Sequence, residues 1–435
     1  MKKLFIFITL IPMIFMLASC KDKDMEGKVV IDFWHMSPVG SPSFSPMKQI
    51  INEFNDSQDK YFVKGTGFSF WDYWDKISLS ISGRTAPDLG LSTIDDVYGR
   101  AKGKVLYNIS ELIENDESEN NIDLDEFRES QLEFARYEGS LYALPFTATA
   151  RALYYNLDIL AEKGYDEDDI PTTWSELKAF AKEFDKVQNG EIVRLGFDPT
   201  YGNATYHGWL WQTGEDFFDE ELNPTLNTAT HVMVLNWIKN FNSEFTRAQL
   251  QTFGESNNIL GIDPFAAQRV AMIVHDDGLD QKIKDAGGTF RYSVAPIPVP
   301  DENGIHVNWG SGFSIEMYDN GKNDTARKEA AFEFLKFLMS KETQIKLAKA
   351  NGWLMSHKSA MVEYTADKPI LKKLLAEVDY AMDKVYVPYA PSWHGNDWQP
   401  FYTQALEGTK TVEQALADAR AHYLQKKQNW ETTNK

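Results

Sequence analysis

Residues 141–160, LYALPFTATARALYYNLDIL, constrain the fold more than any other stretch of the chain. Segments 141–145 and 150–156 are aromatic and aliphatic without a helical period, so they predict two β-strands in succession. Strands alternate with helices elsewhere, and two adjacent strands therefore indicate a change of sheet. We predict that the chain crosses here from one α/β lobe to another, and that these strands line a cleft between the lobes.

Length and charge narrow the class of protein. The 435 residues are too many for one hydrophobic core, so we expect two or three domains. Hydrophobic residues make up 43% of the chain and charged residues 25%, which is typical of a soluble globular protein. The formal net charge of −20 argues against binding to nucleic acid or to anionic lipid headgroups. A neutral or cationic small ligand fits this charge better.

The N-terminus has the pattern of an export signal. Lys2 and Lys3 precede an apolar stretch at 4–17, and small residues lead to Cys20. The sequence Leu-Ala-Ser-Cys resembles the bacterial lipobox, which implies a lipoprotein signal peptide at 1–19 and a lipid on Cys20. Residues 20–28 would then be the lipidated cysteine and a flexible tether to the membrane. Because Cys20 is the only cysteine, the folded part can contain no disulfide and no cysteine nucleophile.

The remaining pattern predicts an α/β protein with a parallel sheet. The first strands and helices follow the order βαβαβ, which implies right-handed crossovers. A capping box at Thr173 and Glu176 marks the start of one helix. We predict strands at 29–34, 61–70, 89–91, 271–274, 292–296 and 309–316, and helices at 45–54, 71–82, 126–136, 157–163, 174–186, 230–242 and 326–339.

Candidate site residues follow from position, because ligands of such sheets bind beyond the carboxyl ends of the strands. The residues at these ends are Trp34, His35 and Ser37 after the first strand, and Ser92, Asp95 and Asp96 after the third.

A second group of candidates follows the strand at 271–274. His275, Asp276 and Asp277 end this strand, and we predict a second crossing between lobes at 274–278 and a third at 315–318. The eight histidines never pair at metal-ligand spacing, and no loop of alternating oxygen ligands surrounds the two aspartates. We therefore predict no metal and no cofactor. A hydrogen-bonded structural pair is the alternative role for Asp276 and Asp277.

Six short motifs resemble, in order, those of extracellular solute-binding proteins of ABC importers, sugar-binding type, and are similar to maltodextrin-binding proteins. The likeness covers about residues 29–425. The motifs are Leu141-Tyr-Ala-Leu-Pro145, Leu153-Tyr-Tyr-Asn156, Pro171-Thr-Thr-Trp-Ser-Glu-Leu177, Trp309-Gly-Ser-Gly-Phe313, Ala330-Ala-Phe-Glu-Phe-Leu-Lys-Phe-Leu338 and Gly352-Trp353-Leu354.

The resemblance implies a type II periplasmic-binding-protein-like fold, with two α/β lobes joined by a hinge of several strands that closes on the ligand. We place residues 29–146 and 276–315 in lobe 1, and residues 147–275 and 316–435 in lobe 2. It also implies a monomer that delivers a carbohydrate to an ABC permease without catalysing a reaction.

The resemblance further implies ligand-binding positions. It supports Trp34, His35, Ser92, Asp95 and Asp96, and adds Thr149, Arg151, Trp309, Gly310 and Trp353. Relatives similar to maltodextrin-binding proteins have a carboxylate near Thr149 that is absent here. Many relatives also have Gly-x-Trp where this chain has His275-Asp276-Asp277-Gly278, so the size and class of the ligand are left open.

The residue types suit a sugar, because aromatic rings pack on the C–H faces of pyranoses while polar side chains bind the hydroxyl groups. Two other functions remain open. A glycoside-cleaving enzyme would use the same aromatic residues with two carboxylates. An adhesin or scaffold lipoprotein would show no saturable binding of a small ligand.

Overall fold

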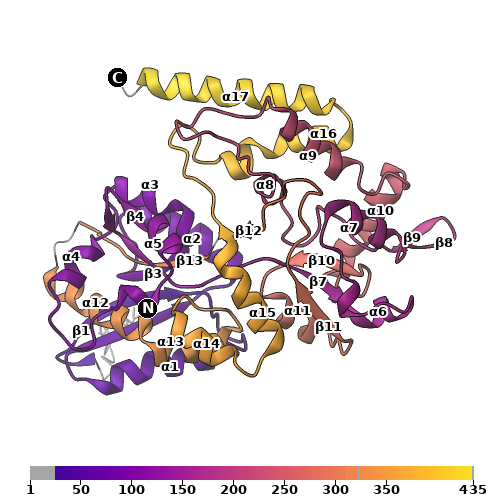
Figure 1. The fold of residues 1–435 in the computed structure, drawn as a ribbon. Coiled ribbons are helices and arrows are strands. Elements are labelled where there is room, and N and C mark those ends of the chain that lie inside the picture. The colour runs from indigo at the N-terminus through magenta and orange to yellow at the C-terminus, as the bar shows by residue number, and fades with distance from the viewer. Residues whose placement is uncertain (1–24, 311, 322–323, 434–435) are drawn as a thin grey trace, which may run out of the picture.

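The computed structural model describes residues 25–310, 312–321 and 324–433. The predicted signal peptide and the predicted lipidation site, Cys20, lie outside the described residues. The described chain forms two α/β lobes side by side, and its last helix, α17 (Val412–Thr433), runs along the top of the molecule from lobe 2 to above lobe 1 (Figure 1). The predicted two-lobe α/β architecture is thus confirmed.

Lobe 1 is built on a five-stranded sheet with the strand order β2-β1-β3-β13-β6. The three parallel strands and the helices between them, α1 (Phe44–Ser57) and α2 (Phe70–Ser82), follow the predicted βαβαβ order. Strand β13 runs antiparallel to both of its neighbours. The strands are β1 (Val29–His35), β2 (Tyr61–Gly67), β3 (Leu89–Thr93), β6 (Ala143–Pro145) and β13 (Phe313–Met317).

Lobe 2 is built on a three-stranded antiparallel sheet in which β7 (Ala152–Asn156) is central. Its neighbours are β10 (Met272–His275) and β11 (Tyr292–Ala295). Helix α7 (Trp174–Lys182) begins with the predicted capping box, because the Thr173 and Glu176 side chains both accept backbone hydrogen bonds. The other helices before β10 are α6 (Leu157–Ala161), α8 (Tyr206–Trp211), α9 (Ala229–Lys239) and α10 (Arg247–Leu260).

The remaining elements connect these sheets or cover them. They are η2 (Ile94–Asp96), α3 (Val97–Lys102), α4 (Ile109–Glu114), η3 (Leu124–Glu126), α5 (Glu129–Phe134), β4 (Arg136–Tyr137), β5 (Ser140–Leu141), η4 (Glu167–Asp169), β8 (Lys186–Gln188), β9 (Glu191–Arg194), α11 (Leu279–Asp285), β12 (Asn308–Trp309), α12 (Thr325–Met339), α13 (Lys341–Asn351), α14 (Lys358–Thr365), α15 (Pro369–Glu377), η5 (Val378–Tyr380), β14 (Ala381–Met382), η6 (Trp393–Asp397), α16 (Gln399–Glu407) and α17 (Val412–Thr433).

The first crossing between lobes lies between β6 and β7, where the sequence places it. The second does not lie at 274–278. After β10 the chain forms α11 and then β11, which pairs with β7 in the same sheet. The chain returns to lobe 1 only between β12 and β13, so residues 276–309 do not belong to lobe 1 as predicted. A turn after an apolar strand has the same pattern whether the next strand joins the same sheet or another.

The C-terminal third is also divided differently from the prediction. Phe334 of α12 packs against Phe33 of β1 and Phe54 of α1, with ring centroids 5.3 and 5.0 Å apart. Helices α12 and α13 therefore cover lobe 1, although we assigned 316–435 to lobe 2. The third crossing follows α14, not 315–318: the Lys373 ammonium of α15 lies 2.9 Å from Glu167 in lobe 2. An amphipathic pattern shows that a helix is buried on one side, but not which sheet it covers.

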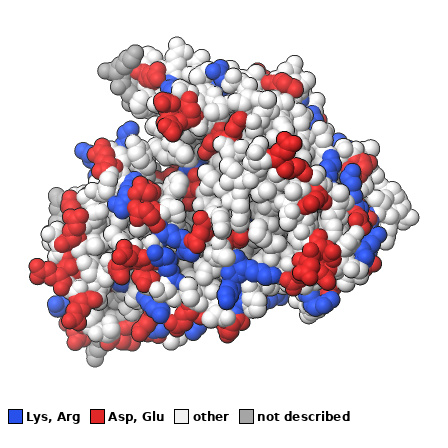
Figure 2. Space-filling view, in the orientation of Figure 1, with Lys and Arg blue, Asp and Glu red and all other residues white. Residues whose placement is uncertain are grey.

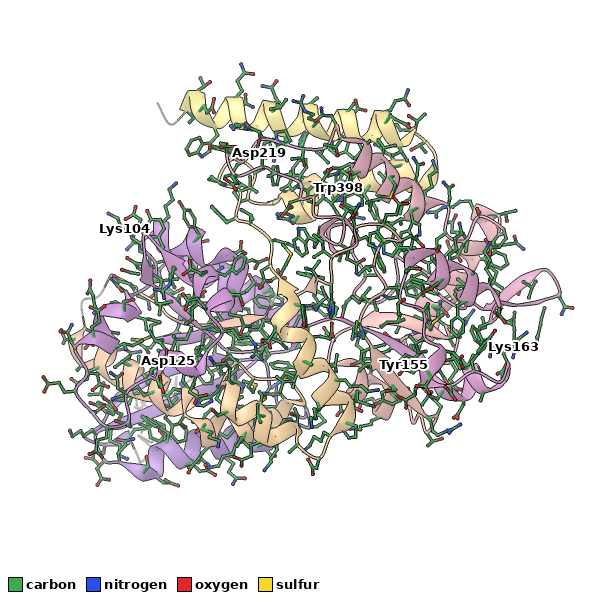
Figure 3. All side chains as sticks on the ribbon, viewed as in Figure 1. Lys104, Asp125, Tyr155, Lys163, Asp219 and Trp398 are labelled. Atoms are coloured by element: carbon green, nitrogen blue, oxygen red, sulfur yellow. The ribbon has the colours of Figure 1, made fainter. Side chains whose placement is uncertain are left out.

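The C-terminal helices complete the core of lobe 2. Trp398, which is labelled in Figure 3, lies at the start of α16. Its ring packs on Tyr206 of α8, and the ring centroids are 4.9 Å apart. Trp174, Trp209 and Trp393 are buried in the same core and cannot contact a ligand from solvent. Within the described part of the chain, no helix has both the length and the apolar character needed to cross a bilayer.

Candidate binding site

Five aromatic side chains form what we call the aromatic wall at the carboxyl edge of the lobe 1 sheet: Phe70, Trp71, Trp74, Phe313 and Trp353. Phe70 and Trp71 stand at the start of α2, shortly after β2 ends, while Phe313 begins β13. Ring centroids are 6.3 Å apart for Phe70 and Phe313 and 5.4 Å apart for Phe313 and Trp353. Trp71 is 79% exposed and Phe70 43%. A continuous, accessible row of rings is a surface on which sugar C–H faces can pack.

Trp34 is connected to the aromatic wall through the rings of Phe68 and Tyr73, the second of which packs on Trp74. The half-buried indole of Trp34 packs edge-on against Phe68, with centroids 4.9 Å apart. His35 and Ser37, by contrast, are buried, and the Ser37 N–H donates to His35 Nδ1 at 3.2 Å. Burial lowers the His35 pKa to about 4, so its ring is neutral at pH 7. The buried side chain of His35 and the backbone of Ser37 therefore fix the conformation of the chain at the carboxyl end of β1.

Trp309 is the centre of a cluster of cations from lobe 2. The Arg151 guanidinium carbon lies 4.1 Å from its ring centroid, and the Lys384 ammonium lies 4.5 Å from it. Arg151 Nη1 also donates to the Trp309 carbonyl at 2.9 Å, and the Gly310 N–H donates to the Met382 carbonyl at 2.8 Å. The indole therefore holds two cations in place. Thr149 is half-buried in the crossing segment just before Arg151.

A cavity that we call the polar hollow lies beside Lys384 and has a volume of about 270 Å³. Asp95 and Asp96 line it from lobe 1, while Lys384 and His394 line it from the segment that packs on lobe 2. Figure 2 shows that this face of the molecule is hollowed between lobe 1 and the C-terminal part. Asp95 Oδ1 and His394 Nδ1 are buried without a hydrogen-bond partner in the protein. Because buried polar atoms are normally hydrogen-bonded, these two atoms indicate that a polar ligand or water binds here.

The charges in the polar hollow are mixed. Burial lowers the pKa of Lys384, although Asp95 acts in the opposite direction. Burial and the charge on Lys384 lower the His394 pKa to about 4, so this ring is neutral at pH 7. Burial and the neighbouring Asp95 raise the pKa of Asp96. The hollow thus offers both donors and acceptors, as a polyhydroxyl ligand requires. Ser92 is buried in the sheet and does not line the hollow.

His275, Asp276 and Asp277 form a network at the end of β10. His275 Nδ1 lies 2.9 Å from Asp276 Oδ1, and Asp276 Oδ2 lies 3.9 Å from Arg151 Nη2. Asp277 Oδ2 accepts a 2.6 Å hydrogen bond from the Leu354 N–H and so links the two lobes. His275 and Asp277 are buried, whereas the Asp276 side chain is 25% exposed.

The pKa values of Asp276 and Asp277 are shifted in opposite directions. Burial works to raise the pKa of Asp276, but the hydrogen bond with His275 and the charges of Arg151 and Lys282 outweigh it and lower that pKa. Burial, together with repulsion from Asp276, raises the pKa of Asp277. Asp276 therefore remains the anion beside Arg151. Of these three residues it is the most exposed.

We did not predict Phe70, Trp71, Phe313, Lys384 or His394 as site residues. Phe70 and Trp71 follow the carboxyl end of β2, so the positional rule applied to the other two strands could have found them. Lys384 and His394 come from a loop that follows no strand of the sheet, and no local signal marks them. In the described residues, no group of three or more His, Asp, Glu or Cys side chains could hold a metal ion.

Comparisons with known proteins identify the family and the fold of the chain. The model of a family described as bacterial extracellular solute-binding protein matches residues 49–373. A Brucella abortus protein described only as a binding protein is 26% identical over 304 residues, which cover 68% of this chain and 71% of that one. The arabinooligosaccharide-binding protein of Bacillus subtilis is 25% identical over 57% of this chain and 56% of its own. The solved structure of CpMnBP1 with mannotriose bound has a TM-score of 0.76 at 21% identity, and covers 91% of this chain and 100% of its own.

Proposed function

Because the chain belongs to the bacterial extracellular solute-binding protein family, we propose that it captures a carbohydrate between its lobes and delivers it unchanged to an ABC permease. The observation that carries this proposal is the pairing of the aromatic wall with the polar hollow. The aromatic wall offers a surface on which sugar C–H faces can pack. The polar hollow contains two hydrogen-bonding atoms without a partner in the protein, Asp95 Oδ1 from lobe 1 and His394 Nδ1 from the segment that packs on lobe 2.

Binding by both lobes gives the protein a way to couple capture to closure. Asp95 and Asp96 belong to lobe 1, whereas His394 packs on Phe217 of lobe 2 with ring centroids 5.7 Å apart. A ligand that bonds to both sides stabilises the closed arrangement more than the open one. The proteins similar in sequence or fold include ones described with arabinooligosaccharide or mannotriose. These ligands support a carbohydrate as the class of solute, and we propose that a monomer binds it.

The first prediction tests ligand class. A sugar that the site recognises, present at about 100 times its dissociation constant, should raise the free energy of unfolding by about 2.7 kcal/mol. We would measure the melting temperature of the soluble domain, residues 25–435, against arabinan, mannan and α-glucan oligosaccharides. Asp95→Ala should melt normally without sugar and lose most of the shift. The proposal is wrong if no sugar of the panel shifts the melting temperature.

The same samples test the alternative of a glycoside-cleaving enzyme. Mass spectrometry of the sugar after long incubation should recover it at its original length. Shortened products would show that the site cleaves its ligand and would contradict a role in transport.

A second prediction concerns the membrane. We propose that the exported chain is anchored through a lipid on Cys20, since this is its only thiol and ends a lipobox-like motif. Cys20→Ser should move the protein from the membrane fraction to the soluble fraction, or leave the signal peptide uncleaved, with sugar affinity unchanged. Mass spectrometry of the N-terminal peptide of the wild type provides the check. A wild-type peptide without lipid at Cys20 would overturn this part of the proposal.

A further inference from the structure

The segment between β14 and η6, residues 383–392, joins the two lobes beside the polar hollow, and we call it the strap. Two of its residues, Val387 and Ala390, are buried in the hydrophobic core of lobe 2. Tyr386 instead contacts lobe 1, because its ring centroid lies 5.1 Å from that of Tyr98 on α3. The strap is therefore anchored in lobe 2 and reaches across to lobe 1.

The contact between Tyr386 and lobe 1 depends on the absence of a side chain at Gly99. A Cβ atom at this position would lie 3.0 Å from Cε2 and from the hydroxyl oxygen of Tyr386, closer than such atoms approach in ordinary van der Waals contact. Gly99 lies inside α3, where glycine weakens the helix relative to any residue with a helix-favouring side chain. The Tyr386 ring thus occupies the space that such a side chain would fill. We call the surface of α3 at Gly99 the notch.

Two further contacts join the same parts of the molecule. The Lys102 ammonium, also on α3, lies 5.8 Å from the ring centroid of Trp430, near the end of α17 (Figure 1). The Tyr389 ring of the strap packs edge-on against the same indole, with centroids 5.0 Å apart. Tyr98 and Lys102 are exposed, and aromatic and cation–π contacts at exposed positions are weak. Such contacts can break without exposing the core of either lobe.

We propose that the notch and the Tyr386 ring form a latch that engages when the lobes close on the ligand and must open before the ligand leaves. The strap also lines the polar hollow, through Lys384 and Tyr386 among others. The engaged latch therefore holds Lys384 at the same cavity as Asp95 of lobe 1. This inference rests on the proposed closure around a carbohydrate, and it adds the residues that set how fast a bound ligand is released.

The test fills the notch from lobe 1 without changing a residue that lines the hollow. Gly99→Leu should keep the Tyr386 ring out of the notch. Because the latch acts only when the lobes are closed, this variant should release sugar about two- to tenfold faster, the contribution of one aromatic contact. Its association rate should equal that of the wild type. Stopped-flow tryptophan fluorescence with arabinan, mannan and α-glucan oligosaccharides measures both rates.

Gly254→Leu is the matched control, because it makes the same change in helix α10 of lobe 2. A Cβ atom at position 254 would meet only the Tyr201 hydroxyl, at 3.6 Å, and the position borders a cavity of about 500 Å³ that has room for the side chain. Both rates should be unchanged. The melting temperature of each variant without sugar checks the fold.

A second measurement needs no sugar. Dyes on Lys104→Cys in lobe 1 and Glu220→Cys in lobe 2 report the distance between the lobes, since residues 25–435 contain no other cysteine. Both positions are exposed, and Figure 3 labels Lys104 and the neighbour of Glu220, Asp219. Single-molecule energy transfer should show a short-distance population in the wild type that Gly99→Leu lacks and Gly254→Leu keeps.

Release of sugar from Gly99→Leu at the wild-type rate, or a distance distribution equal to that of Gly254→Leu, would overturn the latch while leaving sugar capture intact. If Gly99→Leu melts far below the wild type, Tyr386→Leu replaces it in the distance measurement and should lose the same population. Failure of every sugar to bind the wild type would overturn the proposed function. The distance distributions would still decide whether the strap is a latch.

Discussion

Arg100→Met is expected to lower the free energy of unfolding by about 3–5 kcal/mol, because it leaves a buried carboxylate without its cation. The Glu316 side chain is fully buried on β13. Arg100 Nε lies 3.0 Å from both of its oxygens, and Arg100 Nη2 lies 2.5 Å from Oε1. Once Arg100 is removed, the Ser314 hydroxyl still donates to Glu316 at 3.1 Å, but no cation balances the buried carboxylate. Chemical denaturation at pH 7 measures the loss.

The same variant should weaken sugar binding in the protein that still folds. Arg100 Nη2 donates to the Thr93 carbonyl at 2.7 Å, and Nη1 lies 3.8 Å from Asp96. It therefore positions the segment that presents Asp95 to the polar hollow. The double variant Arg100→Met, Glu316→Gln should recover much of the stability, because it buries no uncompensated charge.

Arg291→Met provides a matched control for this pair. Arg291 lies 2.8 Å from Asp158, but both side chains are exposed, so its loss should cost at most about 1 kcal/mol. An effect of Arg100→Met no larger than that of Arg291→Met would show that Glu316 is not held by this ion pair.

The sequence predicts the elements of this fold better than their arrangement. The βαβαβ order and the strand pair at 141–156 follow from local periodicity, and the structure confirms them. The second and third crossings do not follow from it. Whether β11 pairs with β7 or with a strand of lobe 1 depends on contacts between residues more than a hundred positions apart. The hydrophobic pattern of a helix shows which side is buried but not which sheet that side contacts. For this reason α12 and α13 were assigned to the wrong lobe.

The candidate site shows a similar limit. The rule that ligands meet the carboxyl ends of strands selects Trp34 and Asp95, and their contact with a ligand stays a prediction. It does not tell which side chains turn outward, and His35 and Ser92 prove to be buried. Trp309 lies near the cleft as predicted, but its ring is in contact with Arg151 and Lys384. Lys384 reaches this place through the long C-terminal segment, and this tertiary contact has no counterpart in local sequence.

Acidification from pH 7 to pH 4 is expected to destabilise the protein through His35 by about 3 kcal/mol. Burial lowers the pKa of His35 from 6.5 to about 4, a difference of about 2.5 units at 1.36 kcal/mol each. The unfolded chain binds this proton below pH 6.5, whereas the folded chain resists it until about pH 4. The stability contributed by the neutral ring is therefore complete above pH 6.5 and is lost as the pH falls towards 4. Protonation would also remove the acceptor for the Ser37 N–H.

His35→Asn isolates this effect, because an amide oxygen can still accept from Ser37 but does not titrate. Its free energy of unfolding should be lower than that of the wild type at pH 7, and should fall by about 3 kcal/mol less between pH 7 and pH 4. The comparison cancels the contributions of other groups that titrate in this range, among them His394 and Asp277. Parallel pH profiles for the wild type and His35→Asn would show that His35 is hydrated in solution, and that the carboxyl end of β1 is open to water rather than packed against β2.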